Sequence, residues 1–226
     1  MKRIIIVGGS SGIGLNIAKQ LITINNVEVL IASKSKKSIE KAKKILGDSV
    51  KSYVLDATQE ASVIQFFNNI GNFDHLITTI KHEHVNSLFT SPNTMDALHA
   101  FNNKFWGQYY CAKHCLSTIS NKGSIILTSG IASQKGYKGF STTAAINGAI
   151  ESLVKTLAIE LNPIRINAVS PSFIERFPND LKRLHFAKGV EPKLTQLVSL
   201  DDISKIYLSL LENSNKTGEI IYGDIT

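Results

Sequence analysis

The sequence predicts an α/β protein in which a doubly wound parallel sheet of seven strands lies between two layers of helices. Short aliphatic runs alternate with amphipathic helical patterns along the whole chain, an order typical of parallel sheets. The runs are apolar at almost every position, as expected of strands that are buried on both faces. No internal repeat or linker interrupts this alternation, so residues 1–226 are expected to form one domain.

Each strand and helix follows from these patterns in turn. The strands are expected at residues 2–7, 27–32, 50–55, 73–79, 123–129, 164–169 and 219–222. The helices are expected from residue 15 to 22, at 38–46, after a cap at Thr58, at 94–119, from Thr142 or Thr143 to Leu161, and at 201–212. Such sheets bind ligands at the carboxyl ends of their strands. The binding edge is therefore expected at residues 8–14, 32–34, 55–58, 78–84, 128–140 and 169–176.

Composition and charge argue against several classes of partner. The chain of 226 residues is 43% hydrophobic with a mean hydropathy of +0.03, and no apolar run is long enough to span a membrane. The net charge of +7 comes from scattered lysines, without the basic and aromatic stripe of a nucleic-acid-binding protein. Cys111 and Cys115 lie four residues apart on an expected helix and indicate neither a disulfide framework nor a metal site. We expect a cytoplasmic protein without membrane, nucleic-acid or metal partners.

The glycine-rich turn after the first strand predicts an anion site. Gly8, Gly12 and Gly14 are spaced as G-x-x-x-G-x-G, with Ser10, Ser11 and Ile13 between them. Such a turn directs backbone N–H groups and the positive end of the helix dipole at a ligand the size of a pyrophosphate. Residues 8–12 also read G-x-S-x-G, the nucleophile turn of hydrolases. That alternative requires an earlier strand and a later Asp-then-His pair, and the sequence offers neither.

The end of the second strand indicates which dinucleotide is preferred. A free ribose 2′-hydroxyl is usually met by an acidic residue about 20 residues after the glycines. Ser33 and Lys34 occupy that place here, and a hydroxyl followed by an ammonium group would pair with a 2′-phosphate. The sequence thus favours NADP(H) over NAD(H). The alternative is an ordinary surface lysine at the end of a strand.

Several blocks of sequence, in this order, resemble the short-chain dehydrogenase/reductase family. Residues 8–14 match its T-G-x-x-x-G-I-G turn with Val7 in place of Thr, and residues 157–161 with 164–171 match its L-A-x-E-L and I-R-V-N-A-V-x-P-G blocks. Thr217 and Gly218 match its final T-G. The resemblance implies a Rossmann-type fold, a small-molecule substrate, and hydride transfer between NADP(H) and a carbonyl or alcohol. It implies cofactor contacts at Gly8, Ser10, Ser11, Gly12, Ile13, Gly14, Ser33, Lys34, Asp56, Ala57, Thr78, Thr79, Pro171 and Ile174, with Asp56 on the adenine amino group.

The family's catalytic residues are absent from their usual positions. Aligned through the later blocks, the Tyr position falls on Thr143 and the Lys position, four residues on, falls on Asn147. The Ser position falls on Gly130, directly after Ser129, and the Asn position falls on Lys104. A threonine hydroxyl has too high a pKa to act as an acid or base near neutral pH. The chain therefore resembles a divergent member that lacks the Tyr-x-x-x-Lys pair.

One substitution looks paired, because the family's Asn has become Lys104 and its Lys has become Asn147. The hypothesis is that Lys104 reaches into the vacated space and there binds the nicotinamide ribose, stabilises an oxyanion or donates a proton. The alternative is a surface lysine whose stem packs beside Phe105 and Trp106. The candidate catalytic residues are Lys104, Ser129, Thr143 and Asn147, with weaker candidates at Lys81, His82, His84 and Tyr137.

The resemblance leaves two functions open and implies two further features. An oxidoreductase with an atypical proton relay is one function, and a catalytically silent NADP(H)-binding sensor or scaffold is the other. A substrate lid is implied at residues 173–193, a segment that contains both apolar and basic side chains. A homodimer or homotetramer is implied through the helices near 94–119 and 142–161.

Overall fold

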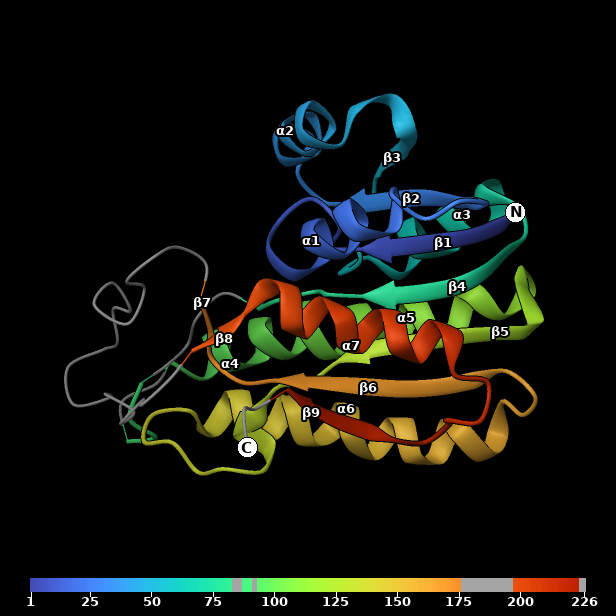
Figure 1. Cartoon of the computed structure of the whole chain (residues 1–226). Coiled ribbons are helices and arrows are strands. Elements are labelled where there is room, and N and C mark those ends of the chain that lie inside the picture. The colour runs from blue at the N-terminus through green and yellow to red at the C-terminus, as the bar shows by residue number, and fades with distance from the viewer. Residues whose placement is uncertain (83–86, 91–92, 176–196, 224–226) are drawn as a thin grey trace.

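Seven parallel strands form one sheet in the order β3-β2-β1-β4-β5-β6-β9 (Figure 1). This computed structural model describes residues 1–82, 87–90, 93–175 and 197–223. The strands are β1 (Lys2–Val7), β2 (Val27–Ser33), β3 (Val50–Val54), β4 (Phe73–Thr78), β5 (Ile119–Thr128), β6 (Arg165–Pro171) and β9 (Ile220–Gly223). The predicted Rossmann-type, doubly wound parallel sheet is confirmed.

The chain reverses its direction of winding at β1, and this reversal places the site. The first three strands run outward from β1, and β4 then returns to pair with the other edge of β1, with Ile4 opposite His75 and Val7 opposite Thr78. The arrows of β1, β4 and β6 in Figure 1 point to the left, so their carboxyl ends lie along that edge. Ligands of open α/β sheets bind where the strand order reverses.

Alternate residues of each strand pack against opposite layers of helices. Ile4 and Ile6 face the layer of α1 (Gly12–Leu21), α2 (Lys36–Leu46) and α7 (Leu200–Glu212). Ile5 and Val7 face the layer of α3 (Glu60–Ile70), α4 (Thr94–Phe101), α5 (Gly107–His114) and α6 (Ser141–Glu160). The period of two in a strand divides the apolar residues between the faces, which gives the three predicted layers.

The expectation of one continuous helix at residues 94–119 is wrong. A π-helical turn at Asn102–Trp106 separates α4 from α5, because the N–H of Gly107 bonds the carbonyl of Asn102. The helical part closes with a 3₁₀ turn at Cys115–Ser117, and Ile119 already belongs to β5. A π turn adds one residue to the helix circumference, so Lys104 within it turns inward.

The other differences are local. Thr58 does not cap α3: its N–H and hydroxyl both bond Asp56 Oδ1, and Gln59 takes the cap position without a side-chain bond. α2 begins two residues early because Ser35 Oγ accepts the N–H of Ser38. Two unpredicted short strands, β7 (Ile174–Glu175) and β8 (Val198–Ser199), pair with each other on either side of residues 176–196. Two-residue strands leave no periodicity to read in a sequence.

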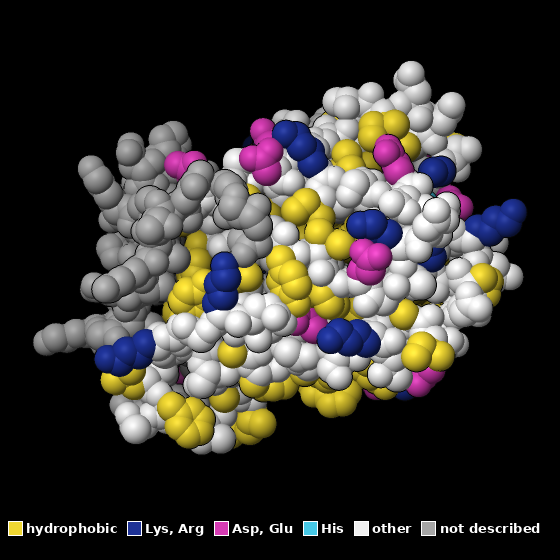
Figure 2. Space-filling model, turned by 60° about the horizontal axis from the view of Figure 1, so that its bottom comes forward, with side chains coloured by type: hydrophobic (Ala, Val, Ile, Leu, Met, Phe, Trp, Pro, Cys, Tyr) yellow, Lys and Arg dark blue, Asp and Glu magenta, His cyan; other side chains and the backbone are white. Residues whose placement is uncertain are grey.

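Charged side chains are dispersed over one face of the molecule (Figure 2). On the face in Figure 2, Lys and Arg side chains lie singly and are interspersed with Asp and Glu. Among the described helices, none has the length and apolar character required to cross a membrane.

Candidate functional site

The glycine turn between β1 and α1 forms a cradle at the carboxyl edge of the sheet. Gly8 has φ +90°, and a Cβ there would lie 2.8 Å from the carbonyl oxygen of Thr79. A Cβ on Gly14 would lie 2.6 Å from the carbonyl oxygen of Gly8. Gly12, with φ +53°, has nothing within 4 Å of its Cβ position. The turn is thus tight against β4 and open at the N-terminus of α1, which suits a phosphate group.

The residues expected around a ribose lie in the turn between β1 and α1 and at the ends of β2 and β3. Ser10 Oγ lies 2.8 Å from Ser33 Oγ, and Lys34 Nζ lies 3.0 Å from Asp56 Oδ2. Burial raises the pKa of Asp56, but hydrogen bonds from Thr58 and Lys34 outweigh it and lower the pKa below its usual value. Asp56 is therefore an anion that holds the Lys34 ammonium group at this edge. The Lys34 side chain is 68% exposed and remains accessible to a ligand.

Beyond the cradle, a cavity of about 230 Å³ opens at the ends of β4, β5 and β6. Seven of the predicted site residues line it: Ile13, Thr79, Lys104, Ser129, Thr143, Asn147 and Pro171. Its described lining includes Lys81, His82 and Lys104 but no Asp or Glu side chain. Apolar side chains from Ile80, Ile131, Phe140 and Phe173 complete the walls. The cavity can therefore hold an apolar molecule with a polar or anionic group.

Lys104 is buried at this cavity and forms a hydrogen bond with Asn147, the residue with which the sequence pattern pairs it. Its side chain is 8% exposed, and Nζ lies 2.7 Å from Asn147 Oδ1 and 2.7 Å from the carbonyl oxygen of Ser129. The alternative of a surface lysine is therefore wrong. An ammonium group has three N–H donors, and the third has no partner among the described residues.

The surroundings of Lys104 bring its pKa closer to neutral pH. Burial lowers the pKa of Lys104 to about 8, against the opposing effect of the Glu151 carboxylate. A group with this pKa can stabilise negative charge as a cation and can also exchange a proton near pH 8.

Asn147 also explains why glycine stands at position 130. Its Nδ2 donates to the carbonyl oxygen of Gly130 over 3.0 Å, and a Cβ on Gly130 would lie only 2.9 Å from the same nitrogen. A serine at position 130 would collide with the Asn147 amide. The changes at Lys104, Gly130 and Asn147 are therefore one packed arrangement rather than three independent ones.

Glu151 is a site residue that the sequence analysis missed. It is 5% exposed, and its carboxylate accepts hydrogen bonds from Ser129 Oγ at 2.8 Å, Ser133 Oγ at 2.6 Å and Gln134 Nε2 at 3.2 Å. The Ser129 hydroxyl proton is thus directed to Glu151 rather than into the cavity. Glu151 lies one helical turn after Asn147 on the buried face of α6, so a carboxylate at a core position was the available signal.

Gln108 is a second missed residue, and it anchors the floor of the site. Its Oε1 accepts from Thr78 Oγ1 at 2.6 Å and the Thr128 N–H at 2.8 Å, and its Nε2 donates to the carbonyl of Lys104 at 3.1 Å. Thr78 is fully buried by these contacts, so its side chain supports the cavity instead of lining it. Only a partially apolar face on α5 hinted at this buried amide.

The remaining candidates fall into separate places. Thr143 Oγ1 lies 3.4 Å from His82 Nε2 at the cavity wall, whereas Tyr137 packs against Phe140 and Phe173. Ala57 is part of the core, Ser11 is exposed before α1, and Ile174 begins β7. His84 and the expected lid beyond residue 175 lie outside the described residues. Within the described ranges, no cluster of three or more His, Cys, Asp or Glu side chains is arranged for a metal ion.

Comparisons with known proteins identify the family and support the fold. A family model described as enoyl-(acyl carrier protein) reductase matches residues 7–225. Short-chain dehydrogenase/reductase ATR9 of Stachybotrys chlorohalonatus is 30% identical, covering 96% of this chain and 93% of the relative. The 3-oxoacyl-[acyl-carrier-protein] reductase FabG of Buchnera aphidicola is 27% identical, covering 96% and 94%. The crystal structure of a small-chain dehydrogenase in complex with NADPH is 34% identical, with a TM-score of 0.80 and coverage of 99% and 96%.

Proposed function

The chain belongs to the short-chain dehydrogenase/reductase family, and we propose that it is an NADP(H)-dependent oxidoreductase with an altered proton relay. The observation that carries the proposal is the buried Lys104 ammonium group, held by Asn147 in the cavity beside the glycine turn. The substrate class is a small carbonyl compound or the corresponding alcohol. A positive, partly apolar cavity favours a carbonyl substrate with apolar substituents.

The residues around the turn fit a nicotinamide dinucleotide. The open space at Gly12 and the N-terminus of α1 would receive the pyrophosphate, and Ser10, Ser33 and Lys34 would face the adenosine ribose. The exposed Lys34 ammonium group supports a preference for a 2′-phosphate, and so does the NADPH bound to a relative of 34% identity. When bound, this cofactor supplies or accepts the hydride.

The chain's own contribution is to hold charge and move a proton. During carbonyl reduction, negative charge grows on the substrate oxygen, and the third N–H of Lys104 is available to stabilise that charge and donate its proton. The resulting neutral amine takes up a proton again from solvent. Glu151 acts as a positioning residue, because it favours the charged form of Lys104 and holds Ser129 of the cavity wall together with Ser133 and Gln134 behind it.

Two measurements test this proposal in order. Isothermal titration calorimetry with NADPH and NADH should give measurable binding with a lower Kd for NADPH. Oxidation of NADPH should then be followed over a panel of aldehydes, ketones and enones. Turnover supports the oxidoreductase, and failure to bind either nucleotide contradicts the whole proposal.

A catalytically silent NADP(H)-binding sensor or scaffold is the second candidate. The observation that favours it is the engagement of Lys104 by two acceptors, because a cation held in this way can serve packing alone. Tight NADPH binding without turnover of any compound in the panel would support this candidate instead.

We also propose a homo-oligomer through α4, α5 and α6. Met95 and Leu98 on α4 expose 53% and 56% of their surface. Trp106 in the π turn is 41% exposed and packs against the rings of Phe105 and Tyr109. Ile159 at the end of α6 is 81% exposed. Exposed apolar side chains clustered in this way mark association surfaces. Light scattering after gel filtration should give a mass of two or four chains.

A further inference from the structure

A second cavity lies at the opposite edge of the sheet from the proposed active site. Its volume is about 470 Å³, and it opens beside the amino ends of β1 and β4, near the point marked N in Figure 1. The apolar walls come from Ile4 on β1, Leu21 and Ile24 at the end of α1, and Leu208 and Leu211 on α7. The volume lies within the range of about 300–1,000 Å³ that is typical of small-molecule sites.

One buried polar side chain faces this cavity with an unsatisfied atom. His75, on β4, is 4% exposed and lines the cavity, and its Nδ1 lies 2.9 Å from Ser124 Oγ. Its Nε2 has no hydrogen-bond partner among the described residues. Among the described residues, the side-chain N and O atoms that are both fully enclosed and without a hydrogen-bond partner are Ser87 Oγ and Ser170 Oγ. His75 Nε2 is not one of them, so it is not fully enclosed. The Nε2 atom is therefore open to the cavity, where a ligand can bond it.

The charge of the site defines the ligand class. Burial, together with the nearby Lys2 cation, lowers the pKa of His75 to about 4, so the imidazole is neutral at physiological pH. Lys2 and Glu212 at the rim carry opposite charges. A neutral imidazole nitrogen pairs best with a hydroxyl group, because a hydroxyl can donate to or accept from either tautomer.

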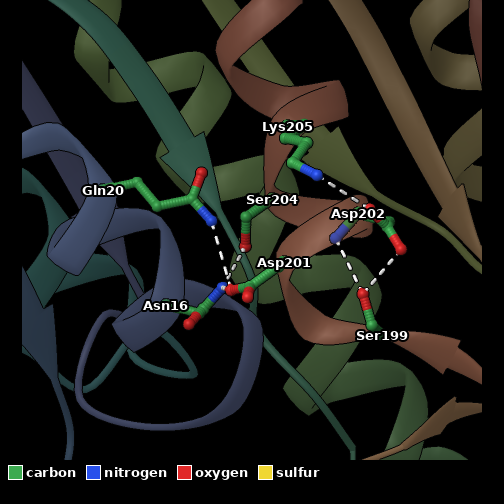
Figure 3. Close-up of polar contacts among 7 residues, drawn as sticks. All are labelled: Asn16, Gln20, Ser199, Asp201, Asp202, Ser204 and Lys205. Carbon is green, nitrogen blue, oxygen red and sulfur yellow. Dashed lines mark hydrogen bonds and ion pairs between the residues drawn. The ribbon is translucent and has the colours of Figure 1, made fainter.

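The two helices that line the cavity, α1 and α7, are tied to each other. At their other ends α1 and α7 are joined by hydrogen bonds from Asn16 Nδ2 to Asp201 Oδ1 at 2.8 Å and to Ser204 Oγ at 3.0 Å (Figure 3). Ser199 caps α7 by accepting the N–H of Asp202 at 3.1 Å, also drawn in Figure 3. Fixing the two helices at one end limits collapse of the gap at the other, as expected of a preformed site.

From this geometry we propose that the cavity between α1, α7 and β4 binds a neutral, mainly apolar small molecule through one hydroxyl group on His75 Nε2. None of the proposed cofactor or catalytic residues lines it, so it is a second ligand site. The proposal requires no nucleotide and is independent of the oxidoreductase function.

The test compares 4-ethylphenol with ethylbenzene, two probes that differ by one hydroxyl group. Protein-detected NMR titration of the full chain, with ring-¹⁵N-labelled histidine, should give a Kd about threefold to tenfold lower for the phenol, the worth of one hydrogen bond. The His75 Nε2 resonance should move on addition of the phenol. In the double variant His75→Phe/Ser124→Ala, which removes both partners of the buried pair, the two probes should bind equally.

Three results would overturn the proposal. They are equal affinity of the two probes for the unaltered chain, a His75 resonance that stays fixed at saturation, and a preference for the phenol that persists in the double variant. The NMR shift in the unaltered chain decides the matter even where the double variant does not fold.

Discussion

Lys104 and His75 are two buried basic side chains, one beside the carboxyl ends and one beside the amino ends of the strands, and their surroundings leave Lys104 charged and His75 neutral at neutral pH. Burial lowers the pKa of Lys104 to about 8 and that of His75 to about 4. Lys104 has two oxygen acceptors and the Glu151 carboxylate nearby. His75 has a serine hydroxyl, and the surrounding charges of Lys2 and Arg165 outweigh the attraction of Asp74.

The difference teaches that burial alone does not decide the charge of a group. At neutral pH the His75 imidazole is uncharged, so no charge is desolvated there, whereas Lys104 still carries its charge in the interior. The lowered pKa of Lys104 corresponds to a cost of about 3 kcal/mol for the charged form. A buried charge that is kept at this cost is consistent with the proposed role of Lys104, because active sites often retain features that reduce stability.

The largest expected effect comes from removing the charged member of the pair. Lys104→Met keeps the length of the side chain but removes the ammonium group, so kcat/KM should fall by about 10²- to 10⁴-fold, the usual worth of a general acid. Steady-state oxidation of NADPH measures the loss, and calorimetry with NADPH shows whether the fold and the cofactor site survive.

The matched control for this variant lies on the next helix. Lys113→Met removes an exposed lysine of α5 that pairs with Glu60, and it should leave kcat/KM within about twofold, as is usual for surface substitutions. A Lys104→Met protein that turns over at the unaltered rate would assign this ammonium group to packing.

The pH dependence of stability should show both groups in separate windows. Between pH 6.5 and 4 the unfolded chain binds a proton at His75 that the folded chain refuses, so the free energy of unfolding falls by about 3 kcal/mol as the pH falls. Between pH 8 and 10.5 the unfolded chain retains the Lys104 proton that the folded chain releases. The free energy of unfolding should therefore rise by about 3 kcal/mol as the pH rises through that window.

Urea denaturation at a series of pH values separates these contributions from those of other groups. The pH dependence of the free energy of unfolding should differ between the unaltered chain and His75→Phe/Ser124→Ala only in the acid window. For Lys104→Met, this pH dependence should differ from that of the unaltered chain only in the alkaline window. A variant that lost both slopes, or neither, would break the assignment of one group to each window.

Most of the fold could be predicted because strands buried on both faces are written as unbroken aliphatic runs. The seven strands of the sheet appear where such runs lie, with shifts of a few residues at their ends. The failures are at features that carry no period. The π turn at Asn102–Trp106 differs from an α-helix by one inserted residue, and the pair β7 and β8 contains two residues in each strand.

The candidate site was predictable only in part, because most of the contacts that build it also leave no periodic pattern in the sequence. Lys104 and Asn147 were found as an exchange because two departures from the family pattern complemented each other, and the structure joins them over 2.7 Å. Glu151 and Gln108 were missed because the contacts that define them come from distant strands and loops. Sequence spacing identifies neighbours on one helix, whereas these buried polar groups depend on long-range packing.

A smaller effect, on the free energy of unfolding, is expected from a substitution at Gly130, against which Asn147 packs. Gly130→Ala places a Cβ 2.9 Å from Asn147 Nδ2, so Asn147 must shift and its bond to Lys104 must lengthen. The expected cost is about 1–3 kcal/mol in the free energy of unfolding, the range for overpacking. Gly136→Ala in the same loop is the control, since nothing lies within 4 Å of that Cβ position. Equal urea midpoints for the two variants would contradict the tight contact.

The smallest effect should come from removing the carboxylate charge that lies near Lys104. Glu151→Gln keeps a carbonyl oxygen for Ser129 and Ser133, and Gln134 can turn its amide to accept from the new NH₂ group. Without the carboxylate charge the pKa of Lys104 falls further below 8, because the one effect that raised it is gone. The alkaline limb of kcat/KM for reduction should therefore move to lower pH, while the rate on the acid plateau changes little. An alkaline limb that stays in place would mean that the proton comes from another group, and His82, beside Thr143 in the cavity wall, is one candidate.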